Sequence, residues 1–399
     1  MGKKSLRARL ELLSGPMAAL LSSIAALAGL LLFRLGSLVN GYAPQEVRSL
    51  QTFSLGEVYT NPLYAPFKLT QLFFIRQLGD SPLHLRFASV IVGFFAVILF
   101  YYVVRSWFSW RVALLTSILF GTSPWFLHSS RFGYVYVTYL SILGLAALAT
   151  YVRSRTIRRP VLILGIMCLL LSVYVPGMLW LIIIGIVWQY KTLAEIIRRY
   201  PLITVLGGLA LAAALSPLIL SFIRNPDLLY TYAGLPQDGI VRLVDVPMSM
   251  LRNLKMIVWS GPTDPAVWLI GRYPLLNFFA VIMSVIGLYS YYLDSKLDRT
   301  KFVVGGMLAG WILVSLGGEV HTTLLLPLCY LLVAGGIAFM LKQWFKVFPY
   351  NPFARSLAVV LLVTAVGAVC WHNMQHYFVA WPQAPATRKV YQPTSPVIQ

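Results

Sequence analysis

The sequence contains few charged residues for a chain of 399. Asp, Glu, Lys and Arg together make up 11% of it, whereas a typical soluble domain carries about 25%. Among the charged residues, the acidic ones are fewer, with 12 against 32 basic ones. Apolar residues make up 59% of the chain. Such a chain cannot cover a water-facing surface, so most of it must face lipid. The composition therefore excludes a set of soluble domains.

Cysteine is also scarce, and Cys168, Cys329 and Cys370 all lie inside apolar runs. Neither a disulfide framework nor a zinc cluster is indicated. A P-loop, a GxGxxG turn, an HExxH pair and a GxSxG elbow are missing as well, which argues against nucleotide hydrolysis, zinc proteolysis and α/β-hydrolase chemistry. His372 and His376 share helical spacing, but two ligands without a third are weak evidence for a metal site.

Long apolar runs are abundant. A helix needs about 20 mainly apolar residues to cross a bilayer, and this criterion predicts about eleven membrane spans. They are 16–38, 84–104, 112–128, 134–152, 161–175, 177–190, 201–223, 274–293, 302–317, 321–341 and 354–371. Pro176-Gly177 is either a tight turn between two spans or a kink in one bent helix. The first span is interpreted as a retained anchor rather than a cleaved signal peptide.

The basic residues favour one orientation in the membrane. With a cytoplasmic N-terminus, most of the 32 Lys and Arg residues fall in short inner segments, most densely at 153–159. The positive-inside rule then predicts a multi-pass protein of the plasma (inner) membrane with an extracytoplasmic C-terminus. This topology also accounts for the net charge of +20 without nucleic acid as a partner.

The predicted architecture is all-α, with a single transmembrane domain over residues 1–371 and an extracytoplasmic C-terminal tail over 372–399. The tail is Pro-rich and is expected to lie loosely over the outer surface. Two outer segments are long, at about 39–83 and 224–273. Each contains an amphipathic pattern, at 61–78 and 247–259, that is typical of a helix at the membrane interface. These helices either cover the bundle or wall a cavity where a lipid head group meets a second substrate.

Charged residues near the membrane boundary are costly and are therefore functional candidates. Glu46 lies just beyond the first span, where a carboxylate can accept a proton from an attacking hydroxyl; the alternative is a solvated or capping acid paired with Arg48. Arg131 offers a planar fork that suits phosphate oxygens, unless it only extends to the interface. For Arg86, a structural role that ties the loop to the bundle is favoured over ligand contact.

Three more polar residues, Asp264, Glu319 and His321, lie at the outer ends of spans. An acid and an imidazole near the same face can bind a cation or shuttle a proton, although a polar turn is the commoner explanation. The sequence indicates no certain cofactor and leaves open whether the protein binds a divalent cation. The sequence shows no internal repeat of the transporter type, and its charges gather at the outer ends of spans, so a secondary transporter ranks last among the functions considered.

Several motifs, in order, resemble those of the GT-C superfamily of membrane glycosyltransferases, in particular the branch with protein O-mannosyltransferases and the lipid A aminoarabinose transferase. The resemblance covers the first span to about residue 150 and resumes weakly at 261–340. The matching residues are Gln45-Glu46, where the family has Asp-Glu; NPLYAP at 61–66 and Gly79-Asp80-Ser81; Leu85, Arg86, Ser89 and Gly93 of a Leu-Arg-x-x-Ser-x-x-x-Gly motif; and Ser123-Pro124 with Ser130-Arg131.

The resemblance implies a transferase that moves a sugar from a polyprenyl-phosphate-linked donor to an acceptor hydroxyl or amine at the outer face. The acceptor stays open between a lipid, a glycan and a protein, and membrane lipid surrounds the chain. The donor phosphate is assigned to Arg131, assisted by Lys68 and Arg86, because the leaving phosphate needs positive charge. Gln45, Asp264 and His321 are assigned to the acceptor or cavity.

One departure from the family affects the chemistry. The family's usual acid is an Asp, and Gln45 in its place cannot deprotonate an acceptor. Glu46 is therefore the predicted base, with Glu57 or Asp264 as alternatives. A protein of the same fold that binds or carries polyprenyl phosphate without catalysis is the second hypothesis.

Overall fold

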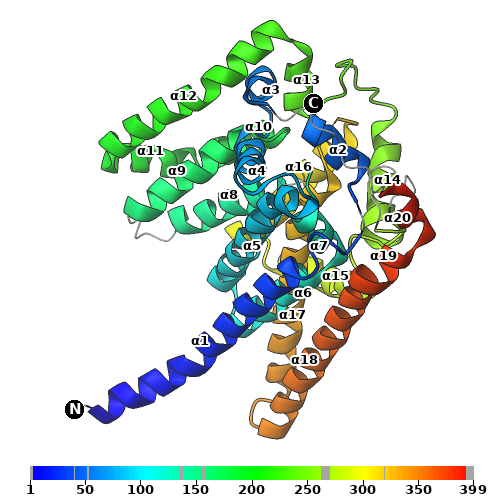
Figure 1. The fold of residues 1–399 in the computed structure, drawn as a ribbon. Coiled ribbons are helices and arrows are strands. Elements are labelled where there is room, and N and C mark those ends of the chain that lie inside the picture. Colours follow the sequence, from blue (N-terminus) through cyan, green and yellow to red (C-terminus); the bar gives the residue numbers. More distant parts are fainter. Residues whose placement is uncertain are drawn as a thin grey trace.

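The computed structural model describes residues 3–39, 41–51, 54–134, 138–153, 159–261, 270–318 and 320–391. Over these residues it is helical and contains no strand, which confirms the all-α class. The first part of the chain forms α1 (Lys3–Leu32), α2 (Pro44–Gln51), α3 (Leu55–Thr60), α4 (Ala65–Leu78), α5 (Pro82–Trp107), α6 (Trp110–Thr122), α7 (Pro124–Arg131) and α8 (Thr138–Arg153). Figure 1 shows α5 to α8 in the middle of the molecule, with α1 extending away from it.

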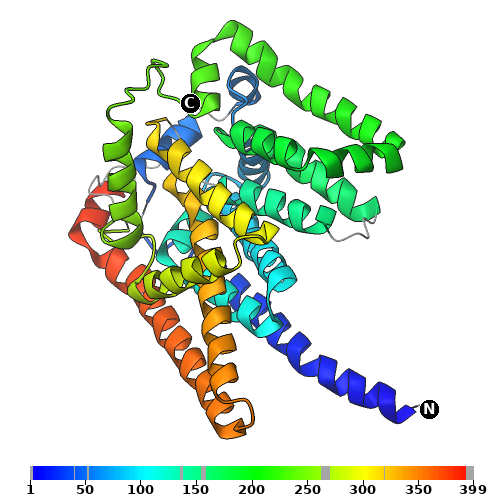
Figure 2. The same ribbon diagram turned by 180° about the vertical axis from the view of Figure 1, so that it is seen from behind.

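The rest of the chain completes the bundle and both of its ends. Its helices are α9 (Arg159–Val173), α10 (Met178–Trp188), α11 (Tyr190–Arg199), α12 (Pro201–Arg224), α13 (Asp227–Ala233), α14 (Val246–Val258), α15 (Phe278–Leu293), α16 (Asp298–Ser315), α17 (Leu326–Val347), α18 (Pro352–Gln375), α19 (Trp381–Gln383) and α20 (Pro385–Val390). A 3₁₀ turn, η1 (Thr322–Leu325), precedes α17, and a π-helical stretch, η2 (His376–Ala380), follows α18. Viewed from behind in Figure 2, α17 and α18 run side by side to a common tip.

Each predicted span contains a helix, but the helices differ in length. Four stretches, which are Pro82–Trp107, Pro201–Arg224, Thr322–Val347 and Pro352–Gln383, are long and apolar enough to cross a membrane. The pair α10 and α11, bent by 78°, makes a fifth if it counts as one span. Five further apolar helices have only 10–17 residues. The chain is thus a multi-pass helical membrane protein, while the number eleven and the orientation of the termini stay predictions.

The break at Pro176-Gly177 is a true interruption. Gly177 has a φ of 76°, a left-handed conformation that favours glycine, and α10 begins directly after it. Its amide donates to the carbonyl oxygen of Tyr232 at 2.9 Å. A single bent helix over 161–190 is therefore excluded, because α9 ends at Val173 and the chain between the two helices bonds to another segment.

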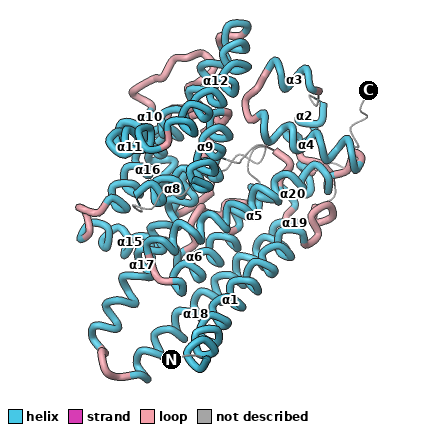
Figure 3. The backbone as a smooth tube through the Cα atoms, turned by 90° about the vertical axis from the view of Figure 1, so that its left-hand side faces the viewer, coloured by secondary structure: helices cyan, strands magenta, loops and turns pink. Residues whose placement is uncertain are grey.

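Both predicted amphipathic helices are present. The pattern at 61–78 forms α4, which buries Phe67, Gln71 and Leu72, and the pattern at 247–259 forms α14. The first outer segment also contains α2 and α3, and the side chain of Ser54 caps α3 by accepting from the Glu57 amide. In Figure 3, α2, α3 and α4 gather at the same end of the molecule as α19 and α20.

The C-terminal tail differs from the expectation. Residues 376–391, which we call the C-terminal cap, pack against the bundle and bury Tyr377, Trp381 and Tyr391 to 2%, 4% and 5% exposure. The Pro-rich composition suggested a loose chain, but the two prolines of the described part, Pro382 and Pro385, stand in the first turns of the short helices α19 and α20, where a missing N–H costs nothing. The aromatic side chains between them then supply the apolar area that fixes the cap.

The helices α15 and α17 approach each other closely at two glycines. A Cβ atom on Gly287 would overlap the carbonyl group of Leu332, and one on Gly336 would overlap that of Met283. Small residues at such positions let two backbones pack in contact inside a membrane. The glycine pair therefore determines how close these helices lie.

Substituting alanine for Gly287 is expected to lower the free energy of unfolding by about 1–3 kcal/mol, because backbone atoms cannot yield as a side chain can. Unfolding in mixed detergent micelles, followed by circular dichroism, measures this loss. Gly367 in α18 is the matched control, since a Cβ there meets nothing within 4 Å. Equal stability of the Gly287→Ala and Gly367→Ala proteins would contradict the packing argument.

Candidate functional site

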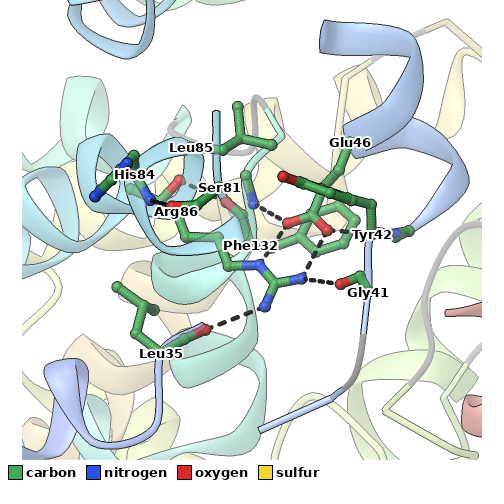
Figure 4. Close-up of polar contacts among 12 residues, drawn as sticks. Leu35, Gly41, Tyr42, Glu46, Ser81, His84, Leu85, Arg86 and Phe132 are labelled. Carbon is green, nitrogen blue, oxygen red and sulfur yellow. Dashed lines mark hydrogen bonds and ion pairs between the residues drawn. The ribbon is translucent and has the colours of Figure 1, made fainter. Parts of the chain in front are cut away.

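The site centres on an ion pair between two distant segments. Glu46 in α2 is fully buried and Arg86 in α5 is 4% exposed. Arg86 Nε donates to Glu46 Oε1 at 2.8 Å, and Nη2 donates to Oε2 at 2.8 Å. Figure 4 shows this two-pronged contact, in which the planar guanidinium faces the carboxylate. Such a pair is both stronger and more directional than a contact with a single bond.

Two backbone amides complete the environment of the Glu46 carboxylate. Ala43 N–H donates to Oε2 at 3.0 Å and Gly133 N–H donates to Oε1 at 2.8 Å. Burial by itself would raise the pKa of Glu46, but Arg86 and these amides outweigh it and hold that pKa below its usual value. Glu46 is thus an ionised carboxylate with both oxygens occupied.

Arg86 connects three parts of the fold. Beyond Glu46, its Nη1 donates to the Leu35 carbonyl and its Nη2 to the Gly41 carbonyl, both at 3.1 Å. The chain that leaves α1 is therefore tied to α5 through one side chain (Figure 4). In this structure Arg86 links the outer loop to the bundle.

The rest of the motif on α5 holds the segment that follows α7. Ser89 Oγ donates to the Phe132 carbonyl at 2.5 Å, and a Cβ on Gly93 would overlap the side chain of Ser130. From α4, Gln71 Nε2 donates to the Gly133 carbonyl at 2.7 Å. Serine and glycine at these positions are thus explained by contact with residues 130–133. Those residues include Arg131.

Arg131 is a buried cation with unused hydrogen-bonding capacity. It is 4% exposed, and its Nη2 donates to the Phe33 carbonyl. Its Nε and Nη1 have no hydrogen-bond partner among the described residues. The guanidinium carbon lies 5.4 Å from the ring centre of Tyr377 and 4.7 Å from that of Phe378, within cation–π range.

A small cavity of about 20 Å³ lies beside these groups. A space of this size holds about one water molecule. The described residues around it include two guanidinium groups and one imidazole but no carboxylate. They are Leu35, Leu38, Val39, Arg86, His128, Arg131, Phe132, Tyr377, Trp381 and Tyr391.

The other predicted site residues are spread over the fold. Lys68 donates through Nζ to the Asn61 carbonyl at 3.0 Å and does not line the cavity. Gln45 is half-buried in α2, next to Glu46. His321 is half-buried, directly before η1, and lies outside the cavity lining. Glu57 lies in the first turn of α3.

Two predicted residues, Asp264 and Glu319, lie outside the residues that the structure describes. Within the described part of the chain, no group of three or more His, Cys, Asp or Glu is arranged to hold a metal ion. His376, one of the two helically spaced histidines, has its Nε2 3.1 Å from the Ile270 carbonyl.

Sequence reasoning missed the residues that close the site. His128 stacks on Phe132 with ring centres 5.0 Å apart and lies edge-on to Trp381 at 5.3 Å. Tyr377 and Trp381 stack on each other at 5.1 Å. The only signal for them was the spacing of four between two aromatic residues in the tail, which is typical of one helix face.

Solved structures share this arrangement of helices. The aminoarabinose transferase ArnT from Cupriavidus metallidurans, in the apo state, is 14% identical with a TM-score of 0.61, over 94% of this chain and 78% of ArnT. ArnT bound to undecaprenyl phosphate is 12% identical with a TM-score of 0.52, over 93% of this chain and 76% of ArnT. The oligosaccharyltransferase from Archaeoglobus fulgidus, in the apo form, is 12% identical with a TM-score of 0.54, over 95% of this chain and 60% of that protein. Comparisons with protein-family models and with curated proteins give no match.

Both similar proteins are glycosyltransferases of the GT-C superfamily. The likeness extends over nearly the whole chain. The chain therefore has the fold of these two membrane glycosyltransferases.

Proposed function

We propose that this protein is a glycosyltransferase that takes a sugar from a polyprenyl-phosphate-linked donor at the outer face of the membrane. The observation that carries the proposal is Arg131, a buried guanidinium whose Nε and Nη1 have no partner among the described residues. A phosphate oxygen is the natural acceptor for two such N–H groups. ArnT has been solved with undecaprenyl phosphate and the archaeal oligosaccharyltransferase with a dolichol-phosphate, which supports a lipid phosphate as the ligand.

The proposed reaction is a substitution at the anomeric carbon of the sugar. The acceptor oxygen or nitrogen forms a bond to that carbon, while the bond between the carbon and the phosphate oxygen breaks. The electron pair leaves with the polyprenyl phosphate, and the acceptor loses its proton to a base. Arg131 would stabilise the negative charge that develops on the leaving phosphate.

For Glu46 we propose a positioning role instead of the role of general base. Both of its oxygens accept hydrogen bonds, from Arg86, Ala43 and Gly133, and its pKa is held low. A general base works best with a pKa near the working pH and with its lone pair facing the substrate. Glu46 instead holds Gly133, which lies two residues beyond Arg131.

A second candidate function is the binding of a polyprenyl phosphate without sugar transfer. The observation that favours it is the cavity lining, which has cationic and aromatic side chains but no carboxylate among its described residues. Gln45, at the position of the family's acid, also cannot accept the acceptor's proton. In this case Arg131 keeps the same ligand, and the chain acts as a lipid-binding subunit or carrier.

Substituting glutamine for Arg131 is expected to weaken the binding of undecaprenyl phosphate by about 10- to 100-fold, because a charge-assisted pair of hydrogen bonds is lost. The measurement is a titration of the full-length protein in phosphatidylcholine nanodiscs with undecaprenyl phosphate. Arg76, an exposed residue in the last turn of α4, is the control, and Arg76→Gln should bind as the wild type does.

Wild-type affinity of the Arg131→Gln protein would remove Arg131 as the phosphate ligand. A second arm uses radiolabelled polyprenyl-phosphate sugars from cell membranes and measures the release of free polyprenyl phosphate. Release that depends on Arg131 supports the transferase. Binding that depends on Arg131, without release from any donor, supports the non-catalytic protein.

A further inference from the structure

The ligand site proposed for Arg131 is closed in this structure. The cavity beside it, about 20 Å³, holds one water molecule at most, whereas a lipid phosphate brings a phosphorus atom and four oxygens. The rings of Tyr377 and Phe378 lie at 5.4 and 4.7 Å from the guanidinium carbon. These rings belong to the C-terminal cap, so the cap occupies the space next to the cation.

The cap reaches this position through an unusual piece of helix. α18 changes to the π-helical stretch η2 at His376, and α19 follows at Trp381. Short π-helical insertions are rare and occur frequently at functional sites. Here the insertion contains both rings that lie over Arg131.

Aromatic rings of the cap pack against residues at the site. Phe378 meets Phe33 edge-on at 5.6 Å, and Trp381 meets His128 at 5.3 Å. The contact leaves buried donors without partners among the described residues, namely Nε and Nη1 of Arg131 and Nε1 of Trp381. A buried donor without an acceptor costs free energy. The closed arrangement is therefore incomplete in a way that an incoming anion would correct.

We infer that the C-terminal cap is a displaceable gate over Arg131. In the closed state, the Tyr377 and Phe378 rings take the place of an anion against the guanidinium. A phosphate group that binds Nε and Nη1 displaces the two rings. The phosphate oxygens must come within hydrogen-bond distance of the guanidinium, and they compete with the rings for the same side of it. The gate itself does not depend on the proposed function. The identification of the anion as a polyprenyl phosphate does rest on that function.

The gate can be tested without any ligand. Phenylglyoxal modifies accessible arginine side chains, and peptide mass spectrometry measures the rate at Arg131 in the full-length protein in phosphatidylcholine nanodiscs. Phe378→Ala is expected to speed this modification about tenfold, because the loss of a cation–π contact raises the open fraction. Phe353→Ala, at an aromatic residue of α18 that is 75% exposed, is the matched control. Equal rates at Arg131 in the two variants would overturn the gate.

Hydrogen exchange tests the gate in the unmodified protein, so that misfolding of a variant does not decide the outcome. Undecaprenyl phosphate is expected to speed exchange of the amides at 377–391, and Phe378→Ala should bind this lipid about fivefold more tightly than the wild type. Slower exchange with the lipid bound would mean that the cap closes on the ligand, which contradicts the proposal.

A further arm separates the gate from the proposed function. Phosphatidic acid offers a phosphate monoester on a different lipid. If Phe378→Ala exposes Arg131 to phenylglyoxal but neither protein binds undecaprenyl phosphate, the gate stands and the proposed function fails. If phosphatidic acid opens the cap as well as undecaprenyl phosphate does, the gate stands and the ligand is a lipid phosphate monoester in general.

Discussion

Substituting methionine for Arg86 is expected to lower the free energy of unfolding by about 3–5 kcal/mol, because it leaves a buried carboxylate without its cation. Glu46 is fully buried, and Arg86 provides two of the four hydrogen bonds that its oxygens accept from described residues. The substitution also frees the Leu35 and Gly41 carbonyls, which Arg86 joins to α5. Unfolding in mixed detergent micelles measures the loss.

The pH dependence of stability should reverse in this variant. In the wild type the pKa of Glu46 is lowered, so the pair contributes stability above the unfolded pKa of about 4.3, and this contribution is lost as the pH falls through the folded pKa. Without Arg86, burial is the dominant influence and raises that pKa. The variant should then be least destabilised in acid and lose stability as the pH rises past about 4.3.

Two comparisons make the Arg86 prediction specific. Arg76→Met alters an exposed arginine of α4 and should change stability little. The double variant Glu46→Gln, Arg86→Met removes both charges and should lose less than the two single losses added together. Exposed ion pairs contribute up to about 1 kcal/mol to stability. If Arg86→Met lowers the free energy of unfolding by less than this, the pair does not act as a buried ion pair.

The same variants distinguish the two roles considered for Glu46. A general base acts only in sugar transfer, so Glu46→Gln would then leave the binding of undecaprenyl phosphate unchanged. A positioning residue holds Gly133 and, through it, the segment with Arg131. In that case Glu46→Gln should weaken both lipid binding and stability.

Substituting alanine for Gly93 is expected to destabilise the protein by about 3 kcal/mol, because the new methyl group would overlap the side chain of Ser130. Gly93 lies on α5, and Ser130 precedes Arg131 in α7. Pushing Ser130 away should move the guanidinium and weaken the binding of undecaprenyl phosphate about tenfold. Thermal unfolding and the nanodisc titration measure the two effects.

A compensating substitution tests the cause of the Gly93 effect. Ser130→Gly removes the Cβ and Oγ atoms that the methyl group would meet, and the next atom, the Ser130 Cα, lies at 3.4 Å. The double variant Gly93→Ala, Ser130→Gly should therefore recover most of the lost stability. If it is no more stable than Gly93→Ala alone, steric overlap is not the cause.

The sequence was sufficient for properties that depend on local pattern. Low charge and long apolar runs predicted a helical membrane protein, because backbone groups in lipid must be satisfied within the helix. The amphipathic pattern predicted α4 and α14, and a Pro-Gly pair marked the break before α10. The spacing of Leu85, Arg86, Ser89 and Gly93 resembled a GT-C motif, and the fold is that of two GT-C glycosyltransferases. Each of these signals lies within a few turns of one helix.

Only the tertiary structure decided which side chains meet. Glu46 had Arg48 as its nearest basic neighbour in the chain, yet its partner is Arg86, 40 residues away. The two interpretations of Arg131, phosphate binding and extension to the interface, differ in burial, and the Tyr377 and Phe378 rings of the tail bury it. The tail's composition predicted a loose chain because its prolines are visible in the sequence. The surface that receives its aromatic rings is built by distant residues, namely Phe33 after α1 and His128 in α7. Pairing and burial depend on segments brought together by folding, so no local pattern determines them.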